Sequence, residues 1–391
     1  MTDPLRDPLF FNDPYSTFAR LRDASPVQKI PTGSKERYSY LVTGYAEARQ
    51  AFADPRLSKD TARFFAGQHS RRNLHPAVSK NMLASDPPQH TRQRGVVAKL
   101  FTTGFVAEMR PYIAKVIDGL LDGWKPGTQV DLVESLAAPL PVTVICQMLG
   151  VPEADHAMVA RWSNDLFAAG KPDCIDAASH AIGDYMTRLV ETGHGEHSGG
   201  LLHTLIQHSK EGLLERDEVV SLAVLLLVAG HETTTNFIGN AVLTLLQNPS
   251  SLTRLRQDPD LIASSLDELL RFDSPVGLAT FRFSTEALQL GGVEIPAGVQ
   301  VLIAPGAANR DPVSFIEPQR LDLDRKASNH LAFGHGIHRC LGAPLARIEA
   351  EEALRAIVTG FPGMRLAIPS EDLEWRQTRL MRGLKVLPVI F

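Results

Sequence analysis

The most informative stretch of the sequence reads Phe333-Gly334-His335-Gly336-Ile337-His338-Arg339-Cys340-Leu341-Gly342. Its glycines predict a tight loop, and the pattern that follows, from about Leu341 to Thr359, predicts a long helix. Cys340 would then lie where a helix begins, next to backbone N–H groups and the positive end of the helix dipole, which favour the thiolate over the thiol. We therefore expect Cys340 to be an anion.

Three functions are compatible with such a cysteine, besides a buried cysteine that has none. As a catalytic nucleophile it would need a base and an orienting group, which sequence spacing does not locate. As a zinc ligand with His335 and His338 it would need a fourth protein ligand, which is not nearby in the sequence. As an axial ligand it would bind a haem iron. The residues of this stretch alone leave these alternatives open.

A second informative segment is a long helix predicted from Asp217 to Gln247, whose first half is apolar on nearly every face and should run through the core. There it reaches Ala229-Gly230-His231-Glu232-Thr233-Thr234-Thr235, where glycine and hydroxyl residues interrupt the helix. This stretch is either a polar turn or a place where Gly230 lets a flat ligand approach and Thr233 bonds the i−4 carbonyl or that ligand. A zinc-protease motif is excluded, because it needs a second histidine where Thr235 stands.

The rest of the chain predicts a mainly α fold with a smaller β region. Helical patterns occupy residues 89–272 and 341–360, and β-rich parts lie near 27–42, 276–304 and 364–391, the first as a hairpin. Residues 54–88 predict an irregular segment with short helices and, like residues 165–200, are a candidate lid. No repeat or linker divides residues 1–391, so we expect a single domain. We interpret four histidines as part of a solvated loop and helix rather than a metal site: His194, His197, His203 and His208.

Composition excludes several classes of function. A net charge of −4 without a basic run argues against nucleic acid as a partner. The N-terminus lacks the basic and apolar regions of a secretory signal, and the longest apolar run, Leu222 to Ala229, is far shorter than the roughly 18 residues of a membrane span. Cys146, Cys174 and Cys340 are too scattered for a disulfide framework. We expect a soluble, cytoplasmic monomer with no membrane contact.

The pattern Phe333-x-x-Gly336-x-His338-x-Cys340-x-Gly342 resembles the haem-binding signature of the cytochrome P450 monooxygenases. Three further motifs resemble those of the family and occur in the same order. They are Asp86 to Arg94, similar to the segment with which bacterial members hold the haem propionates, Ala229 to Thr234, similar to the oxygen-activating stretch, and Glu268-x-x-Arg271 with Arg320. The resemblance covers nearly the whole chain and implies the cytochrome P450 fold, with a long central helix over the haem.

The resemblance also implies roles for individual residues. The cofactor would be haem b with Cys340 as its axial thiolate ligand, and Glu232 and Thr233 would be catalytic, supplying protons during oxygen activation. Glu268, Arg271 and Arg320 would be structural. The cofactor-binding residues would be His90, Arg94, Ala229, Gly230, Arg282, Phe333, Gly334, His338, Cys340 and Gly342.

A mostly apolar lining suits a bulky hydrophobic substrate. The expected reaction is hydroxylation or epoxidation of a small-molecule metabolite that is macrolide-like, polyketide-like or steroid-like, because the chain is similar to members that tailor macrolides and related metabolites. The expected pocket residues are Phe64, Leu83, Ala84, Leu225, Leu226, Val276, Gly277 and Leu278.

Electrons and O2 must come from outside the chain, which shows no second cofactor signature. The resemblance implies a ferredoxin and a ferredoxin reductase as electron donors, docked on Arg92, Lys99, Arg339 and Arg347. Two alternatives remain: a haem-thiolate enzyme that uses peroxide or couples substrates oxidatively, and a haem-thiolate sensor without turnover.

Overall fold

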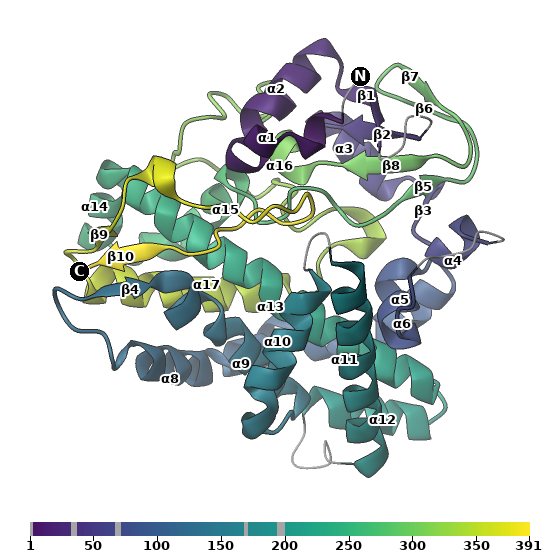
Figure 1. Cartoon of the computed structure of the whole chain (residues 1–391), viewed down its shortest axis with the longest axis horizontal. Helices are drawn as coiled ribbons and strands as arrows, with labels where there is room; N and C mark the ends of the chain where they lie inside the picture. The colour runs from purple at the N-terminus through teal and green to yellow at the C-terminus, as the bar shows by residue number, and fades with distance from the viewer. Residues whose placement is uncertain (1–2, 33–36, 67–71, 168–170, 194–199) are drawn as a thin grey trace.

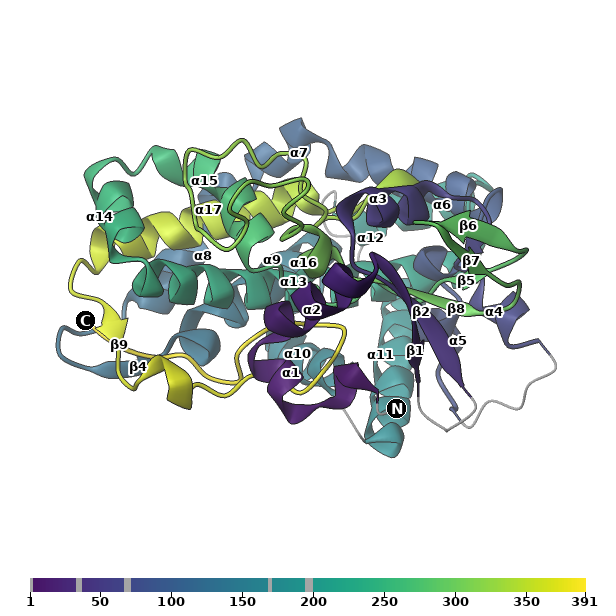
Figure 2. The same ribbon diagram turned by 90° about the horizontal axis from the view of Figure 1, so that it is seen from above.

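The computed structural model describes residues 3–32, 37–66, 72–167, 171–193 and 200–391. Most of these residues are helical, which confirms the predicted mainly α class with a smaller β region. In both views a five-stranded sheet lies at one end of the molecule, and α14 (Pro249–Gln257), β9 (Arg365–Leu366) and β10 (Pro388–Ile390) lie at the opposite end (Figure 1 and Figure 2). His194, His197 and parts of both candidate lids lie outside the described residues.

Aspartates start the N-terminal helices. Asp7 and Asp13 each accept a backbone N–H bond at the starts of α1 (Pro8–Asn12) and α2 (Pro14–Ala24), both of which begin with proline. β1 (Val27–Pro31) and β2 (Tyr38–Val42) then pair in antiparallel fashion. This pairing confirms the predicted hairpin.

The five-stranded sheet has the order β1-β2-β8-β5-β3. Its remaining strands are β3 (Leu57–Ser58), β5 (Phe283–Ser284) and β8 (Gln300–Ile303), and β2 and β8 run parallel. A separate hairpin pairs β6 (Leu288–Leu290) with β7 (Val293–Ile295), and β10 lies between β4 (Gln129–Asp131) and β9. The strands after residue 276 therefore follow the predicted β-rich parts.

The other regular elements of the described chain are helices, which loops connect. The irregular segment 54–88 contains two short ones, α4 (Thr61–Phe64) and α5 (Pro76–Ser79), as predicted. The other helices are α3 (Tyr45–Ala53), α6 (Gln89–Val97), α7 (Thr103–Glu108), α8 (Arg110–Leu121), α9 (Pro139–Leu149), α10 (His156–Leu166), α11 (Pro172–Thr192), α12 (Leu201–Lys210), α13 (Arg216–Gln247), α15 (Leu261–Phe272), α16 (Pro305–Ala308) and α17 (Ala343–Gly360).

The predicted long helix is α13, which crosses the middle of the molecule (Figure 1). A capping box between Glu215 and Glu218 starts it, and it ends before Asn248-Pro249, as predicted. It packs against α9, α11, α12 and α17 and lies in the largest apolar cluster. By length and composition α13 could span a membrane, but 67% of its most apolar 18-residue window is buried inside the protein.

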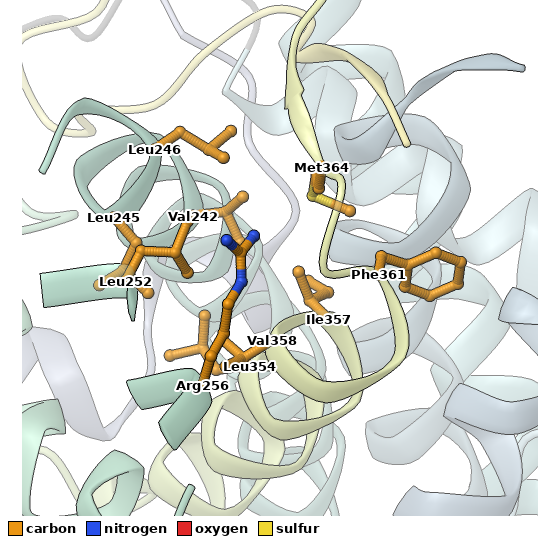
Figure 3. A pocket seen from close by; sticks show the side chains of 10 residues that line it. All are labelled: Val242, Leu245, Leu246, Leu252, Arg256, Leu354, Ile357, Val358, Phe361 and Met364. Carbon is orange, nitrogen blue, oxygen red and sulfur yellow. The ribbon is translucent and has the colours of Figure 1, made fainter. Parts of the chain in front are cut away.

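A small cavity lies between α13, α14 and α17 (Figure 3). Its volume is about 10 Å³, close to the minimum for one water molecule. The Arg256 side chain extends among its apolar walls, and the Arg256 Nε atom is buried without a hydrogen-bond partner. This cavity is too small for a bulky substrate. Its lining residues are Val242, Leu245, Leu246, Leu252, Arg256, Leu354, Ile357, Val358, Phe361 and Met364.

Candidate active site

The loop before α17 presents Cys340 three residues before the helix begins. The Cys340 N–H group donates to the Phe333 carbonyl at 2.8 Å, which closes the loop. Gly334 and Gly336 have φ angles of 70° and 74°, in the left-handed region that favours glycine. A Cβ atom at Gly336 would lie 2.7 Å from the Phe52 carbonyl oxygen. The predicted tight loop is therefore present, and α3 packs closely against it.

Opposing influences act on the pKa of the Cys340 thiol. Burial of the sulfur among protein atoms raises the pKa of the Cys340 thiol, although the Gly342 and Ala343 N–H groups and the Arg94 and Arg339 side chains act in the opposite direction. The residue as a whole is nonetheless exposed, so a ligand can reach it. Desolvation therefore opposes the effect of the helix start on this thiol. A coordinating metal ion deprotonates a thiol outright.

α13 has one accessible stripe within its buried length. Leu225 and Thr233 are half-buried and Ala229 is exposed, and their spacing of four residues places them on one face of the helix. The Thr233 hydroxyl donates to the Ala229 carbonyl at 3.4 Å. The i−4 carbonyl is one of the two partners that the sequence predicts for this hydroxyl, and the other is a ligand. Leu226 is buried in the main core, and its helical phase differs by about 100° from that of Leu225.

Gly230 has a packing neighbour that the sequence does not reveal. A Cβ atom on Gly230 would lie 2.9 Å from Cγ1 of Ile145, which belongs to α9. The absence of a side chain at Gly230 therefore lets α9 approach α13. The contact does not involve the accessible stripe that contains Ala229.

Glu232 is paired with an arginine that the sequence analysis missed. Arg376 Nη1 donates to Glu232 Oε2 at 2.6 Å, and Arg376 Nη2 donates to Oε1 at 3.3 Å. The Glu232 side chain is 2% exposed, and Arg376 comes from the segment between α17 and β10. No local pattern could have revealed a partner 144 residues away.

A cluster of basic side chains, most of them buried, lies beside His338 of the cysteine loop. The rings of His90 and His338 lie 4.2 Å apart between centroids, and both ring nitrogens of His90 are buried without a partner. Arg282 is 4% exposed, and its Nε atom is also buried without a partner. Lys59, which the sequence analysis missed, is 3% exposed and bonds Thr280 Oγ1. The Leu57-Ser58-Lys59-Asp60 stretch has no feature that marks the lysine as part of a site.

The pKa values of these groups reflect burial first and, for His338 and Lys59, the neighbouring cations second. Burial, followed by Lys59, His90, Arg282 and Arg94, lowers the pKa of His338 to about 2. Burial also lowers the pKa of Arg282 to about 10, with Asp86 opposing it. For Lys59, burial and then Arg282 hold the pKa well below its usual value. Such a cluster costs free energy without a counter-charge and therefore fits an anionic ligand, such as the carboxylates of a haem.

Arg94 lies at the edge of the basic cluster and also bonds the cysteine loop. Its Nη2 atom donates to the Arg339 carbonyl at 2.6 Å, and burial lowers its pKa. The Arg94 side chain is half-buried. Arg94 thus connects α6 to the cysteine loop.

The structural pair predicted on α15 is present and wholly buried. Arg271 donates to Glu268 through Nε and Nη2 at 2.6 and 2.8 Å, and both side chains are 0% exposed. Arg325 joins Glu268 at 3.2 Å with a side chain 14% exposed. The prediction that Arg320 joins the pair is wrong, because its side chain is 63% exposed and bonds Glu317 instead. Only the Arg320 carbonyl contacts Arg271.

The remaining expected pocket residues do not form one group. Phe64 packs against Phe281 and Phe283, and Leu83 and Ala84 are half-buried in a short 3₁₀ helix. Val276 and Gly277 are half-buried, with Val276 bridged to Met381. Leu278 is 3% exposed and packs in a cluster with the N-terminal helices.

The zinc alternative finds no support in the described residues, where no group of three or more His, Cys, Asp or Glu side chains could hold a metal ion. His203 and His208, on α12, belong to no such group. A single metal ligand is what haem iron requires from this side of the site, because the porphyrin supplies the others.

Comparisons with known proteins identify the family. The cytochrome P450 family model matches residues 175–363, which include α13 and the cysteine loop. The chain is 42% identical over 391 residues to cytochrome P450 107B1 of Saccharopolyspora erythraea, covering 98% of this chain and 96% of that protein. It is 41% identical to the cytochrome P450 monooxygenase PikC of Streptomyces venezuelae, covering 97% and 91%.

A solved structure supports the same assignment. The tirandamycin C-bound P450 monooxygenase TamI superimposes with a TM-score of 0.91 at 41% identity, covering 98% of both chains. The basic cluster and the exposed Cys340 fit the family's haem, which a cysteine thiolate ligates. The chain therefore belongs to the cytochrome P450 family and is a monooxygenase with a haem cofactor, for which Cys340 is the axial thiolate ligand.

Proposed function

We propose that the protein hydroxylates or epoxidises a bulky hydrophobic metabolite, of the macrolide, polyketide or steroid type, with O2 and electrons from a ferredoxin. The accessible stripe on α13 carries this proposal. It places apolar Leu225 and Ala229 beside the hydroxyl of Thr233, so that a hydrophobic substrate and a proton-carrying group would share one face of the helix. Relatives named PikC, vitamin D(3) 25-hydroxylase and 6-deoxyerythronolide B hydroxylase support this substrate class.

We propose that the basic cluster holds the haem carboxylates. His90, Arg94, Arg282 and His338 would bond them, and Lys59 joins this set on the evidence of its burial next to Arg282. Bound haem supplies the iron at which O2 is activated. The neighbours proposed to pack on the haem or shape its loop are Ala229, Gly230, Phe333, Gly334 and Gly342.

Glu232 and Thr233 are proposed to move protons. The Thr233 hydroxyl lies on the accessible stripe and can pass a proton, while buried Glu232 can connect it to solvent through Arg376. Because Glu232 and Thr233 are adjacent on α13, Thr233 can face the substrate while Glu232 faces the pathway to solvent. Glu268 and Arg271, with Arg325, are proposed to hold the loop that precedes Cys340.

An acidic ferredoxin, reduced by ferredoxin reductase, is the proposed electron donor to a monomeric protein in the cytoplasm. Of the four cations expected to bind it, Arg92, Lys99 and Arg339 are exposed, and no described residue forms an ion pair with Lys99 or Arg339. Arg92 forms a two-pronged pair with Glu218, and Arg347 bonds Asp267. Docking would therefore depend more on Lys99 and Arg339 than on the two paired arginines.

A spectroscopic titration followed by product analysis tests the proposed function. The purified protein should contain haem b, and its reduced carbon monoxide complex should have the red-shifted Soret band of thiolate ligation. Macrolides, polyketides and steroids would then be screened for spectral shifts, and turnover with ferredoxin, ferredoxin reductase and NADPH should give a product heavier by one oxygen atom. Products that lack added oxygen would favour oxidative coupling, and a lack of any product would favour a sensor.

Oxidative coupling is the second candidate function. CxnD, an enzyme described as forming a C–S bond, superimposes on this chain with a TM-score of 0.89 at 34% identity. The same scaffold thus occurs with a reaction other than hydroxylation. A product lighter by two hydrogen atoms would support this candidate.

A further inference from the structure

The carboxylate proposed to carry protons is bound by an arginine from a distant part of the chain. Both oxygens of Glu232 accept hydrogen bonds from Arg376, at 2.6 and 3.3 Å. The Arg376 side chain is 29% exposed and therefore reaches solvent, whereas that of Glu232 is 2% exposed. An arginine partner favours the ionised form of a carboxylate, and an ionised carboxylate has no proton to donate. Proton delivery by Glu232 thus requires that this pair loosen.

Arg376 is carried by residues 375–384, which we name the C-terminal loop. Trp375 and Leu384 form an antiparallel bridge that closes the loop. Arg376 N donates to the Gly383 carbonyl at 2.9 Å, so the arginine stands at the base of the loop, directly opposite Gly383.

The base of the C-terminal loop is docked on α13. Asn240, two turns after Thr233, donates from Nδ2 to the Arg382 carbonyl at 3.0 Å. A Cβ atom at Gly383 would lie 1.9 Å from Asn236 Oδ1, so only glycine allows this approach. The position of Arg376 beside Glu232 depends on this close docking.

The other end of the C-terminal loop contacts Val276 and Gly277, two residues that the family resemblance implies for the substrate pocket. Met381 is bridged to Val276, and Gly277 N donates to the Leu380 carbonyl at 2.9 Å. The Leu380 side chain is 42% exposed. A ligand in contact with Val276 and Gly277 would therefore touch the same loop whose base holds Arg376.

We propose that Arg376 is a positioning residue for Glu232, and that the docking of the C-terminal loop on α13 controls whether Glu232 is available as a proton carrier. This inference rests on the proposed role of Glu232. The loop transmits its position to the carboxylate through one bidentate ion pair, so a shift at either end of the loop would change how Arg376 holds Glu232.

Infrared difference spectroscopy of the haem-loaded protein tests the proposal without turnover. The band of a protonated carboxyl group is assigned to Glu232 by its loss in Glu232→Gln. Arg376→Met should raise the protonated fraction of Glu232 at a given pH by about tenfold or more. Arg376→Lys should restore most of the wild-type signal, because it keeps the charge.

The loop itself is tested with Arg376 intact. Gly383→Ala forces the base of the C-terminal loop away from Asn236, and Asn240→Ala removes the other anchor, so each should raise the Glu232 signal toward that of Arg376→Met. Gly360→Ala is the matched control, since a Cβ atom there has no neighbour within 4 Å, and should leave the signal unchanged. A wild-type signal in Arg376→Met, or in both loop variants, would overturn the inference.

Failure here is distinguishable from failure of the proposed function. The carbon monoxide spectrum and the melting temperature of each variant show whether it is folded and loaded. Wild-type protein that makes no oxygenated product removes the proposed function but leaves the infrared result to decide the role of Arg376. Variants with normal infrared spectra in an active enzyme remove the inference alone.

Discussion

His90 of α6 and His338 of the cysteine loop face each other at 4.2 Å between ring centroids, inside a cluster of buried basic groups. Burial and neighbouring cations lower the pKa of both histidines, so both imidazoles are neutral at physiological pH. A neutral imidazole still donates one N–H bond, and an incoming carboxylate would relieve the repulsion among the cations around it. Binding of a carboxylate at the haem site would thus offset the unfavourable repulsion that is present in the haem-free protein.

Lys59→Met should show both the destabilisation of the haem-free protein by this lysine and its contribution to haem binding. Removal of a buried cation beside Arg282 should stabilise the haem-free protein by about 1 kcal/mol or more, measured by urea unfolding. The same change should speed haem transfer to apomyoglobin roughly tenfold, because one charge-assisted hydrogen bond is lost. Lys80→Met, at an exposed lysine, should alter neither quantity. Equal haem retention in the two variants would remove Lys59 from the proposed site.

Thr233→Ala should uncouple oxygen use from product formation. The variant lacks the hydroxyl on the accessible stripe but loses only a 3.4 Å bond to Ala229, so its melting temperature should change little. We expect product per NADPH to fall about tenfold or more, with hydrogen peroxide released instead. The measurement is a parallel assay of NADPH, peroxide and product. Unchanged coupling would exclude Thr233 from proton delivery.

Arg325→Met and Arg320→Met test which arginine supports the buried pair. Loss of Arg325 leaves Glu268, which is 0% exposed, with one cation fewer, and should cost about 1–3 kcal/mol of unfolding free energy. Arg320 is largely exposed, and its loss should cost less than about 0.5 kcal/mol. Urea unfolding of the haem-loaded protein gives both values. A larger loss of unfolding free energy in Arg320→Met than in Arg325→Met would support Arg320, the arginine that the sequence predicted.

Glu349→Gln should stabilise the protein increasingly as pH rises. Both Glu349 oxygens are buried without a partner in the described residues, and burial raises the pKa of this carboxyl well above 4.5. The folded state therefore holds a proton that the unfolded state loses above about pH 4.5, so stability falls as pH rises from there toward the raised pKa. Glutamine has no such penalty. Melting temperatures from pH 5 to 8 should show a growing advantage for Glu349→Gln, and none for Glu371→Gln at an exposed site.

The sequence predicted features that depend on local pattern. The long helix, its end before Asn248, the hairpin at 27–42 and the loop around Cys340 all follow from periodicity, capping and glycine placement. The desolvation of the Cys340 thiol does not follow from such a pattern, because it depends on the surrounding fold.

Local patterns could not predict the ion pairs between residues that lie far apart in the sequence. Arg376 reaches Glu232 across 144 positions, and Arg325 rather than Arg320 joins Glu268, because loop paths decide which guanidinium arrives. Lys59 looked like a surface lysine in a polar stretch. In each case the missing information is tertiary, and charged residues carry little periodic signal of their place in a fold.

The accessible stripe on α13 has a consequence for how this protein can diversify. A core helix normally fixes the size of its side chains, since each one is packed on all sides. Leu225 escapes that constraint although it lies in the first half of a buried helix. New side chains there can reshape what the enzyme accepts at little cost to folding, which makes Leu225 a natural first position for evolution, or a designed library, to vary.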